Sequence, residues 1–216
     1  MKTISSILCL LLTALAARAA AEPPFIQRSR TSSESAYAGI TAIAPDGSSV
    51  AYLSVDLRAM TTTMDLTQDS GTPPFSFSNT SLTVTAQIYA ADGSTESLNG
   101  AAPLAAGSYS LSNSSASVSG VPVTLEGYRY GADGSFSFVS RPVIVTASWA
   151  AMSTFSRDSS NCTSGGSYRA QSRSSSMTYD ASFSGAILDE AGSDLIATGD
   201  VIAGIGSGLS ASYVAF

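Results

Sequence analysis

The sequence predicts an all-β protein whose antiparallel strands form a sandwich-like pair of sheets. The first observation behind this prediction is strict alternation of apolar and polar residues, as in residues 81–90, where Leu82, Val84 and Ala86 alternate with threonine and glutamine. The second is a recurring Asp-Gly-Ser turn between such segments. Helical periodicity is almost absent, and strands about every ten residues are typical of sandwiches and barrels.

Further strands are predicted wherever the alternation returns along the chain. Residues 121–125 and 143–149 repeat it, and residues 176–188 and 194–205 read as two more strands near the end. Trp149 shares parity with Val143 and Val145, so we expect its ring in the core.

Tight turns are expected at three Asp-Gly-Ser sequences, residues 46–48, 92–94 and 133–135. Glycine adopts positive φ without steric penalty, and aspartate accepts hydrogen bonds from the backbone of the turn. The segment from Asp189 to Asp194, DEAGSD, predicts a fourth hairpin of this kind.

The expected strand pattern resembles immunoglobulin-like or jelly-roll sandwiches, in architecture alone, because the paired cysteines of antibody domains are absent. We expect a single domain over residues 36–216. Residues 22–35 are polar and predict a flexible leader. Residues 153–176 are rich in serine, glycine and arginine and predict either a long loop or a strand pair.

The first 21 residues have the pattern of a secretory signal peptide. Lys2 precedes an apolar run over residues 4–17, and small residues follow at 19–21. Export to the periplasm or the extracellular space is therefore expected. Removal of this segment would leave Cys162 alone, as a free thiol or as one half of a bridge between two chains.

Composition excludes several functions. The chain has no histidine and carries its one lysine at position 2, which removes the Ser-His-Asp and Ser-Lys catalytic arrangements and imidazole metal ligands. A formal net charge of −6 argues against nucleic acid as a partner. No glycine-rich phosphate motif predicts a nucleotide, and no later apolar run predicts a transmembrane span.

Carboxylates are the remaining candidates for catalysis or metal binding. Asp65 with Asp69 could serve as the pair that glycoside hydrolysis needs. Asp189, Glu190 and Asp194 could do the same, or could supply oxygen ligands for calcium, the one cofactor considered. Turn chemistry explains all of these carboxylates without catalysis, so we expect no enzyme and no catalytic residue.

A hairpin at residues 128–138, YRYGADGSFSF, is the candidate ligand-binding element. A β-bulge at Glu126-Gly127 would turn its four rings into the core, whereas a regular strand would leave them outside as an aromatic strip for a polysaccharide or a peptide. The candidate ligand-binding residues are Tyr128, Arg129, Tyr130, Phe136 and Phe138.

The sequence thus predicts a secreted, non-catalytic structural, adhesive or ligand-binding protein. One alternative is a carboxylate-dependent enzyme acting on glycans, and another is an outer-membrane β-barrel, suggested by the terminal Phe216. Self-association through an edge strand or through Cys162 is a further expectation. Glycosylation sequons occur at Asn79, Asn113 and Asn161.

Overall fold

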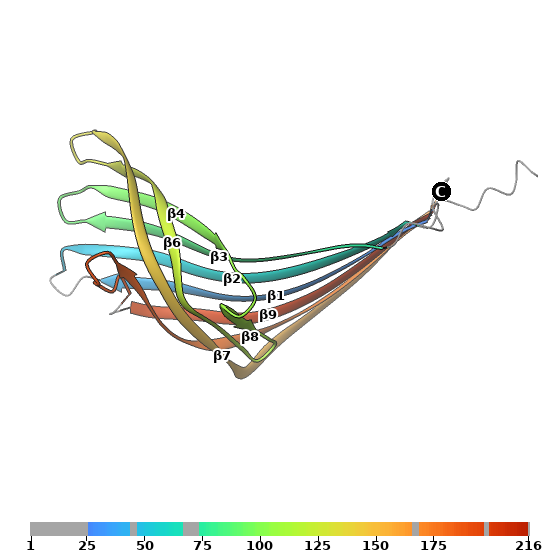
Figure 1. Cartoon of the computed structure of the whole chain (residues 1–216). Helices are drawn as coiled ribbons and strands as arrows, with labels where there is room; N and C mark the ends of the chain where they lie inside the picture. The colour runs from blue at the N-terminus through green and yellow to red at the C-terminus, as the bar shows by residue number, and fades with distance from the viewer. Residues whose placement is uncertain (1–25, 44–46, 67–73, 166–168, 197–198, 216) are drawn as a thin grey trace, which may run out of the picture.

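The structure of the chain is a computed structural model and describes residues 26–43, 47–66, 74–165, 169–196 and 199–215. The described residues form nine antiparallel strands (Figure 1). In chain order these are β1 (Ile26–Ile43), β2 (Ser49–Leu66), β3 (Phe75–Ala90), β4 (Thr95–Pro103), β5 (Tyr109–Leu111), β6 (Ser115–Tyr130), β7 (Phe136–Ser164), β8 (Arg169–Asp189) and β9 (Gly199–Ala215).

All nine strands belong to one sheet with the order β4-β3-β2-β1-β9-β8-β7-β6-β5, and β4 also pairs with β6. The prediction of an all-β antiparallel fold is confirmed. The expected division into two stacked sheets is not what the pairing shows, because the ladder runs through a single sheet that closes on itself. The physical reason is the length and curvature of the strands, which bring β4 round to β6.

Closure involves one half of the molecule. In Figure 1 the strands curl around each other in this closed half, and the longer ones continue as a tapering arm. We define the arm by residues 26–35 of β1, 59–66 of β2, 75–80 of β3, 152–164 of β7, 169–180 of β8 and 206–215 of β9. β4, β5 and β6 do not extend into the arm, so it has two edges and no covering layer among the described residues.

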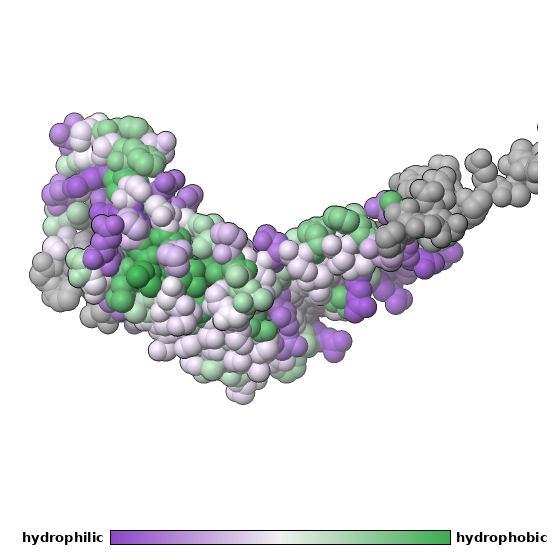
Figure 2. All heavy atoms as spheres, viewed as in Figure 1, coloured by the Kyte–Doolittle hydropathy of each residue, from purple (hydrophilic) through white to green (hydrophobic). Residues whose placement is uncertain are grey.

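The core lies on the inner face of the closed half. Alternate side chains along each strand point inward, as Ala36, Ala38 and Ile40 do on β1. The largest fully buried side chains, all on this face, are Trp149, Leu57, Leu82, Leu125, Ile187 and Ile205. Figure 2 shows hydrophobic residues gathered on the visible surface of the closed half as well. Burial of the inner face is the main stabilising contribution to the fold.

The predicted turns are confirmed in three hairpins of the same form. In each, a glycine has positive φ: Gly93 at 80°, Gly134 at 82° and Gly192 at 78°. In each, the backbone amide of that glycine donates to the carbonyl oxygen three residues earlier, at 2.9–3.0 Å. The Asp-Gly-Ser turn at residues 46–48 lies partly outside the described residues.

One segment expected to be flexible is a strand, and one for which a loop or a strand pair was expected is a strand pair. Residues 26–35 of the predicted leader pair on both sides, with β2 and with β9, and residues 22–25 lie outside the described part. Within the predicted loop or strand pair at residues 153–176, residues 155–164 of β7 pair with β8, so the described part is a strand pair. The serine-rich composition misled the prediction of a leader, because serine and threonine suit a strand whose two faces are both open. The predicted signal peptide lies outside the described residues.

Glycines permit the closure between β4 and β6. A Cβ atom at Gly127 would overlap the carbonyl oxygen of Ser97, and one at Gly100 would overlap that of Thr124. The strands therefore approach more closely here than side chains would allow.

We predict that Gly127→Ala weakens the β4–β6 pairing and lowers the free energy of unfolding by about 1–3 kcal/mol, because the new methyl group must displace backbone. Denaturant unfolding measures the change. Gly165→Ala is the matched control, since nothing lies within 4 Å of its Cβ. Equal stability of the two variants would contradict the closure described here.

We predict a loss of about 3–5 kcal/mol for Trp149→Ala. Trp149 is 2% exposed, its indole Nε1 donates to the carbonyl oxygen of Tyr37 at 3.0 Å, and it packs edge-on against Phe183. Ile144→Ala, on the same strand but facing out, should change stability far less. The same denaturant titration distinguishes them, and comparable losses would show that the inner face is not the core.

Candidate functional site

The candidate hairpin joins β6 to β7 and has the predicted pairing. Tyr128 lies opposite Phe138, and Tyr130 lies opposite Phe136, on the outer face of the closed half. Their rings contact one another: Tyr128 stacks on Phe136 with centroids 4.7 Å apart, and meets Phe138 edge-on at 5.9 Å. The four rings therefore form one cluster.

The ring cluster is exposed to solvent. Its four side chains are 45–61% exposed, although Leu125 on the same strand is fully buried. The register of β6 and β7 is continuous from Val121 to Tyr130, so the bulge considered at Glu126-Gly127 is absent. The irregularity falls earlier, between Val118 and Val121, where Gly120 has a φ of 63°. This irregularity reverses the inward and outward positions of β6 once. Because the register is regular from there on, the rings stay on the outer face.

The cluster continues sideways as rows that cross five strands. Directly opposite residues share a face, so consecutive pairings define each row. One row consists of Tyr52, Gln87, Ser97, Tyr128 and Phe138. The next consists of Val50, Tyr89, Thr95, Tyr130 and Phe136. Tyr52 and Tyr89 also meet edge-on, with ring centroids 5.9 Å apart. We call the two rows together the aromatic rows.

A shallow groove of about 740 Å³ lies along the first of these rows, the one that contains Tyr52, Tyr128 and Phe138. Tyr52, Tyr128 and Phe138 contribute its rings. Hydrogen-bonding side chains lie beside them, namely Ser54, Thr85, Gln87, Ser97, Asn99 and Glu126. Such a mixture of flat apolar surfaces and fixed polar groups is typical of a site for a neutral, polar ligand.

Arg129 does not join the aromatic rows. It has the inner-face parity of β6, and its guanidinium donates to the Ser94 hydroxyl at 3.1 Å and pairs with Asp92 at 3.3 Å, beside the turn between β3 and β4. Hydrogen bonds from the Ser94 side chain and backbone, and then the charge of Arg129, hold the pKa of Asp92 below its ordinary value. Arg129 thus binds Asp92 and Ser94 and does not face the groove in which a ligand would lie.

A second ion pair, which the sequence did not reveal, lies nearby and joins the buried Glu96 to the exposed Arg141 side chain. Glu96 is 7% exposed and lies 2.7 Å from the guanidinium of Arg141. Glu96 precedes the buried Leu98 by two residues on β4, so its parity points inward. That parity was a usable signal, but the partner on β7 depends on the closure. A hollow of about 470 Å³ borders these groups.

In the predicted site at Asp189–Asp194, both aspartates accept hydrogen bonds from nearby backbone amides. Oδ1 of Asp189 accepts hydrogen bonds from the backbone amides of Ala191 and Ser193, and Oδ1 of Asp194 accepts from those of Ile187 and Ile196. Glu190 is exposed. Across the described residues, no three His, Cys, Asp or Glu side chains come close enough to hold a metal ion, so the candidate calcium ligands do not converge.

The candidate pair of Asp65 and Asp69 cannot be compared, because Asp69 lies outside the described residues. Asp65 is half-buried on β2, opposite Arg28 of β1.

Cys162 is exposed on the arm, with a free thiol, opposite Ser172 of β8. Residues 155–164 of β7 pair with β8 alone among the described strands, so their other edge is open. This edge could accept a strand from another chain. Residues 26–35 cannot be the donor while they hold their place in β1. Self-association through this edge or through Cys162 stays a prediction.

Comparison with known proteins gives no assignment: no protein-family model matches the sequence, and no curated protein matches it. Within the described ranges, no helix is long and apolar enough to cross a membrane. Function must therefore be argued from the surfaces themselves.

We predict that the stability of the turn in the aromatic hairpin depends on pH. Hydrogen bonds from the Ser135 side chain and backbone lower the pKa of Asp133 from its ordinary value of 3.8. The stabilisation is complete above the unfolded pKa and is lost as pH falls through the lowered, folded value.

Asp133→Asn should therefore melt below the native chain at neutral pH, and the difference should shrink as the pH falls below about 4. Thermal melts from pH 7 to pH 2 measure it. Asp158→Asn removes a charge from the exposed arm and controls for the change in net charge. A difference that stays constant down to pH 2 would contradict the proposed role of the ionised Asp133.

Proposed function

We propose that the protein is an exported, non-catalytic binding protein that holds a neutral polysaccharide across the aromatic rows. The observation that carries this proposal is the alignment of exposed rings and hydrogen-bonding side chains in register over five strands. An exported adhesin or a binding module would use such a surface to attach to a glycan.

The dimensions of the aromatic rows suit a chain of sugars. Neighbouring strands lie about 4.8 Å apart, so Tyr52 and Phe138, four strand positions apart, are separated by about 19 Å along the row. Several sugar residues in succession could lie over that length. Aromatic faces pack on the C–H surfaces of sugar rings, and Gln87 and Asn99 are placed to bond their hydroxyls.

Binding without hydrolysis is favoured by the single carboxylate that lines the groove. Glycoside hydrolysis uses two carboxyl groups on either side of the scissile bond. Glu126 is the acidic residue in the groove lining, and it has no second carboxylate beside it there. Glu126 is better suited to accept hydrogen bonds from sugar hydroxyls. Export itself rests on the N-terminal sequence pattern.

We predict that Tyr128→Ala/Phe138→Ala weakens binding to a neutral polysaccharide by about tenfold or more, since both rings line the groove and contact each other. Affinity electrophoresis against a panel of neutral polysaccharides identifies the ligand, and calorimetry then compares the variants. The matched control is Phe155→Ala, an exposed aromatic of the arm at 61% exposure. Binding that survives in the double variant would refute the assignment of the aromatic rows.

The same preparations test the rival hypothesis of an enzyme. Incubation of each bound polysaccharide with the protein should release no new reducing ends. Release that disappears in Glu126→Gln, with binding intact, would show that the groove is catalytic.

A further inference from the structure

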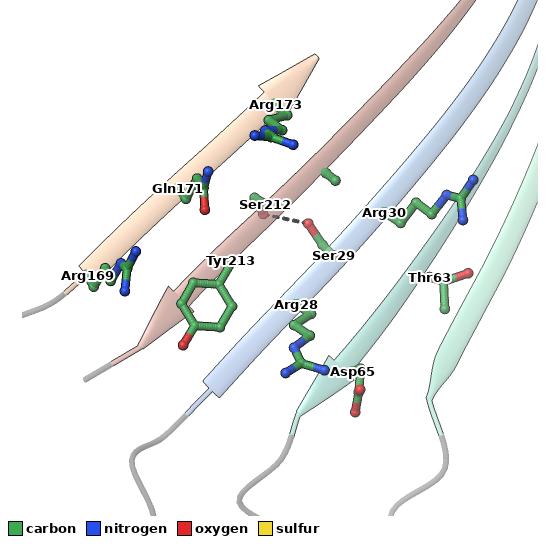
Figure 3. Close-up of a pocket in the computed structure, with 11 residues that line it drawn as sticks. Arg28, Ser29, Arg30, Thr63, Asp65, Arg169, Gln171, Arg173, Ser212 and Tyr213 are labelled. Atoms are coloured by element: carbon green, nitrogen blue, oxygen red, sulfur yellow. Dashed lines mark hydrogen bonds between the residues drawn. The ribbon is translucent and has the colours of Figure 1, made fainter. Parts of the chain in front are cut away.

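The far end of the arm contains a second hollow, of about 660 Å³, on the continuation of the inner face (Figure 3). β9 runs along its floor, with β1 on one side and β8 on the other. Four exposed arginines line it: Arg28 and Arg30 from β1, and Arg169 and Arg173 from β8. We call these residues the arm arginines.

Strand register explains why these arginines lie around the same hollow. Arg28 is an even number of residues from the buried Ala36, so it shares the inner-face parity of β1. Two rows then cross the hollow. The first consists of Gln171, Tyr213, Arg28 and Asp65, and the second of Arg173, Ala211, Arg30 and Thr63. In Figure 3 the ring of Tyr213 lies between Arg169 and Arg28.

The charge of this hollow is opposite to that of the protein as a whole, which has a formal net charge of −6. In the closed half, Arg129 and Arg141 are neutralised by Asp92 and Glu96. Among the described residues, by contrast, none of the arm arginines makes an ion pair. Asp65 is the one carboxylate in the lining, so the hollow keeps a net positive charge. Such a concentration of one sign attracts an oppositely charged ligand.

The chemistry of the hollow indicates an anion carried on a ring. Guanidinium groups bind carboxylates with two parallel hydrogen bonds, and they do so better than lysine. The arginines of β1 and those of β8 lie on either side of Tyr213, and the two strands are about 10 Å apart, which is two strand spacings. A sugar ring could pack on the tyrosine while its carboxylate reaches the arginines of one of these strands. Arginines also repeat along each strand, about 7 Å apart on β1 and about 13 Å apart on β8, which suits a chain with repeating charges.

We propose that the arm arginines bind an acidic polysaccharide with carboxylate groups, a uronate chain. This site is separate from the aromatic rows, and the proposal does not depend on the function assigned to them. An anionic lipid surface would be the other source of negative charge, but it is disfavoured because the hollow presents only Tyr213 and Ala211 as apolar groups to insert.

Equilibrium binding of polygalacturonate to the full chain tests the proposal, with its fully methyl-esterified form as the matched uncharged ligand. We expect polygalacturonate to bind at low ionic strength and the ester to bind at least about tenfold more weakly, since it cannot form charge-assisted hydrogen bonds. Binding should also fall as salt rises to about 0.15 M.

The variant Arg28→Gln/Arg169→Gln should weaken polygalacturonate binding by about tenfold or more and leave binding of neutral polysaccharide unchanged. Arg58→Gln is the matched control, because Arg58 is an exposed arm-side arginine with the opposite parity on β2. A third variant, Tyr213→Phe, keeps the ring and should bind as the native chain does. Circular dichroism of each variant verifies the fold.

Several results would overturn the proposal. These are equal binding of the methyl ester, equal weakening by Arg58→Gln, or no binding of polygalacturonate even at low salt. Binding of phosphatidylglycerol vesicles that depends on Arg28 and Arg169, in the absence of polygalacturonate binding, would assign the hollow to a membrane surface instead. Loss of neutral-glycan binding in the Tyr128→Ala/Phe138→Ala variant alone would leave this inference intact.

Discussion

Closure of the sheet through β4 and β6 is the constraint on which the rest of the structure depends. β4 has nine residues, yet it pairs with β3 on one side and with β6 on the other. Gly127 and Gly100 allow this approach by having no side chain. Once the ladder is closed, one face of every strand in the closed half is hidden from water. The apolar alternation along the strands then becomes a core without a second sheet.

The same closure decides which side chains remain outside. Tyr128 and Tyr130 have the parity opposite to Leu125, so the strand that buries the leucine must expose the tyrosines. The rows on the outer face gain their length from closure too, because Ser97 of β4 connects Gln87 of β3 to Tyr128 of β6. The core and the proposed glycan surface are two consequences of one pairing.

Where closure ends, the chemistry of the strands changes. Both faces of the arm are open, and its side chains are largely serine, threonine and arginine. Hydroxyl groups bond across the strands, as Ser29 does with Ser212 at 2.7 Å and Ser160 does with Ser174 at 2.8 Å. Such pairs add to the backbone ladder and keep an uncovered sheet compatible with water. This accounts for the serine-rich composition as a property of an exposed strand surface.

Local features of the sequence predicted much of this fold, and non-local ones did not. Alternation identified parts of β3, β6, β7, β8 and β9 and placed Trp149 in the core, and Asp-Gly-Ser identified turns, because both depend on neighbours in the chain. The sequence suggested a bulge in β6 at Glu126-Gly127, and this suggestion is wrong, because the irregularity lies at Gly120 instead. The cluster of arm arginines was not predicted, because Arg28 and Arg169 are brought near each other only by the pairing of both strands with β9. The ion pair of Glu96 was not predicted either, because it too depends on pairing between strands distant in the sequence.

The most direct test of this account is the thermal melt of Tyr128→Ala/Tyr130→Ala beside the native chain. Closure without a bulge at Gly127 puts both rings in solvent, so the account predicts that the midpoint shifts by no more than a few degrees. A fall of well over ten degrees would mean that the rings are core. That result would contradict the register of β6, and the outer-face rows would lose their basis.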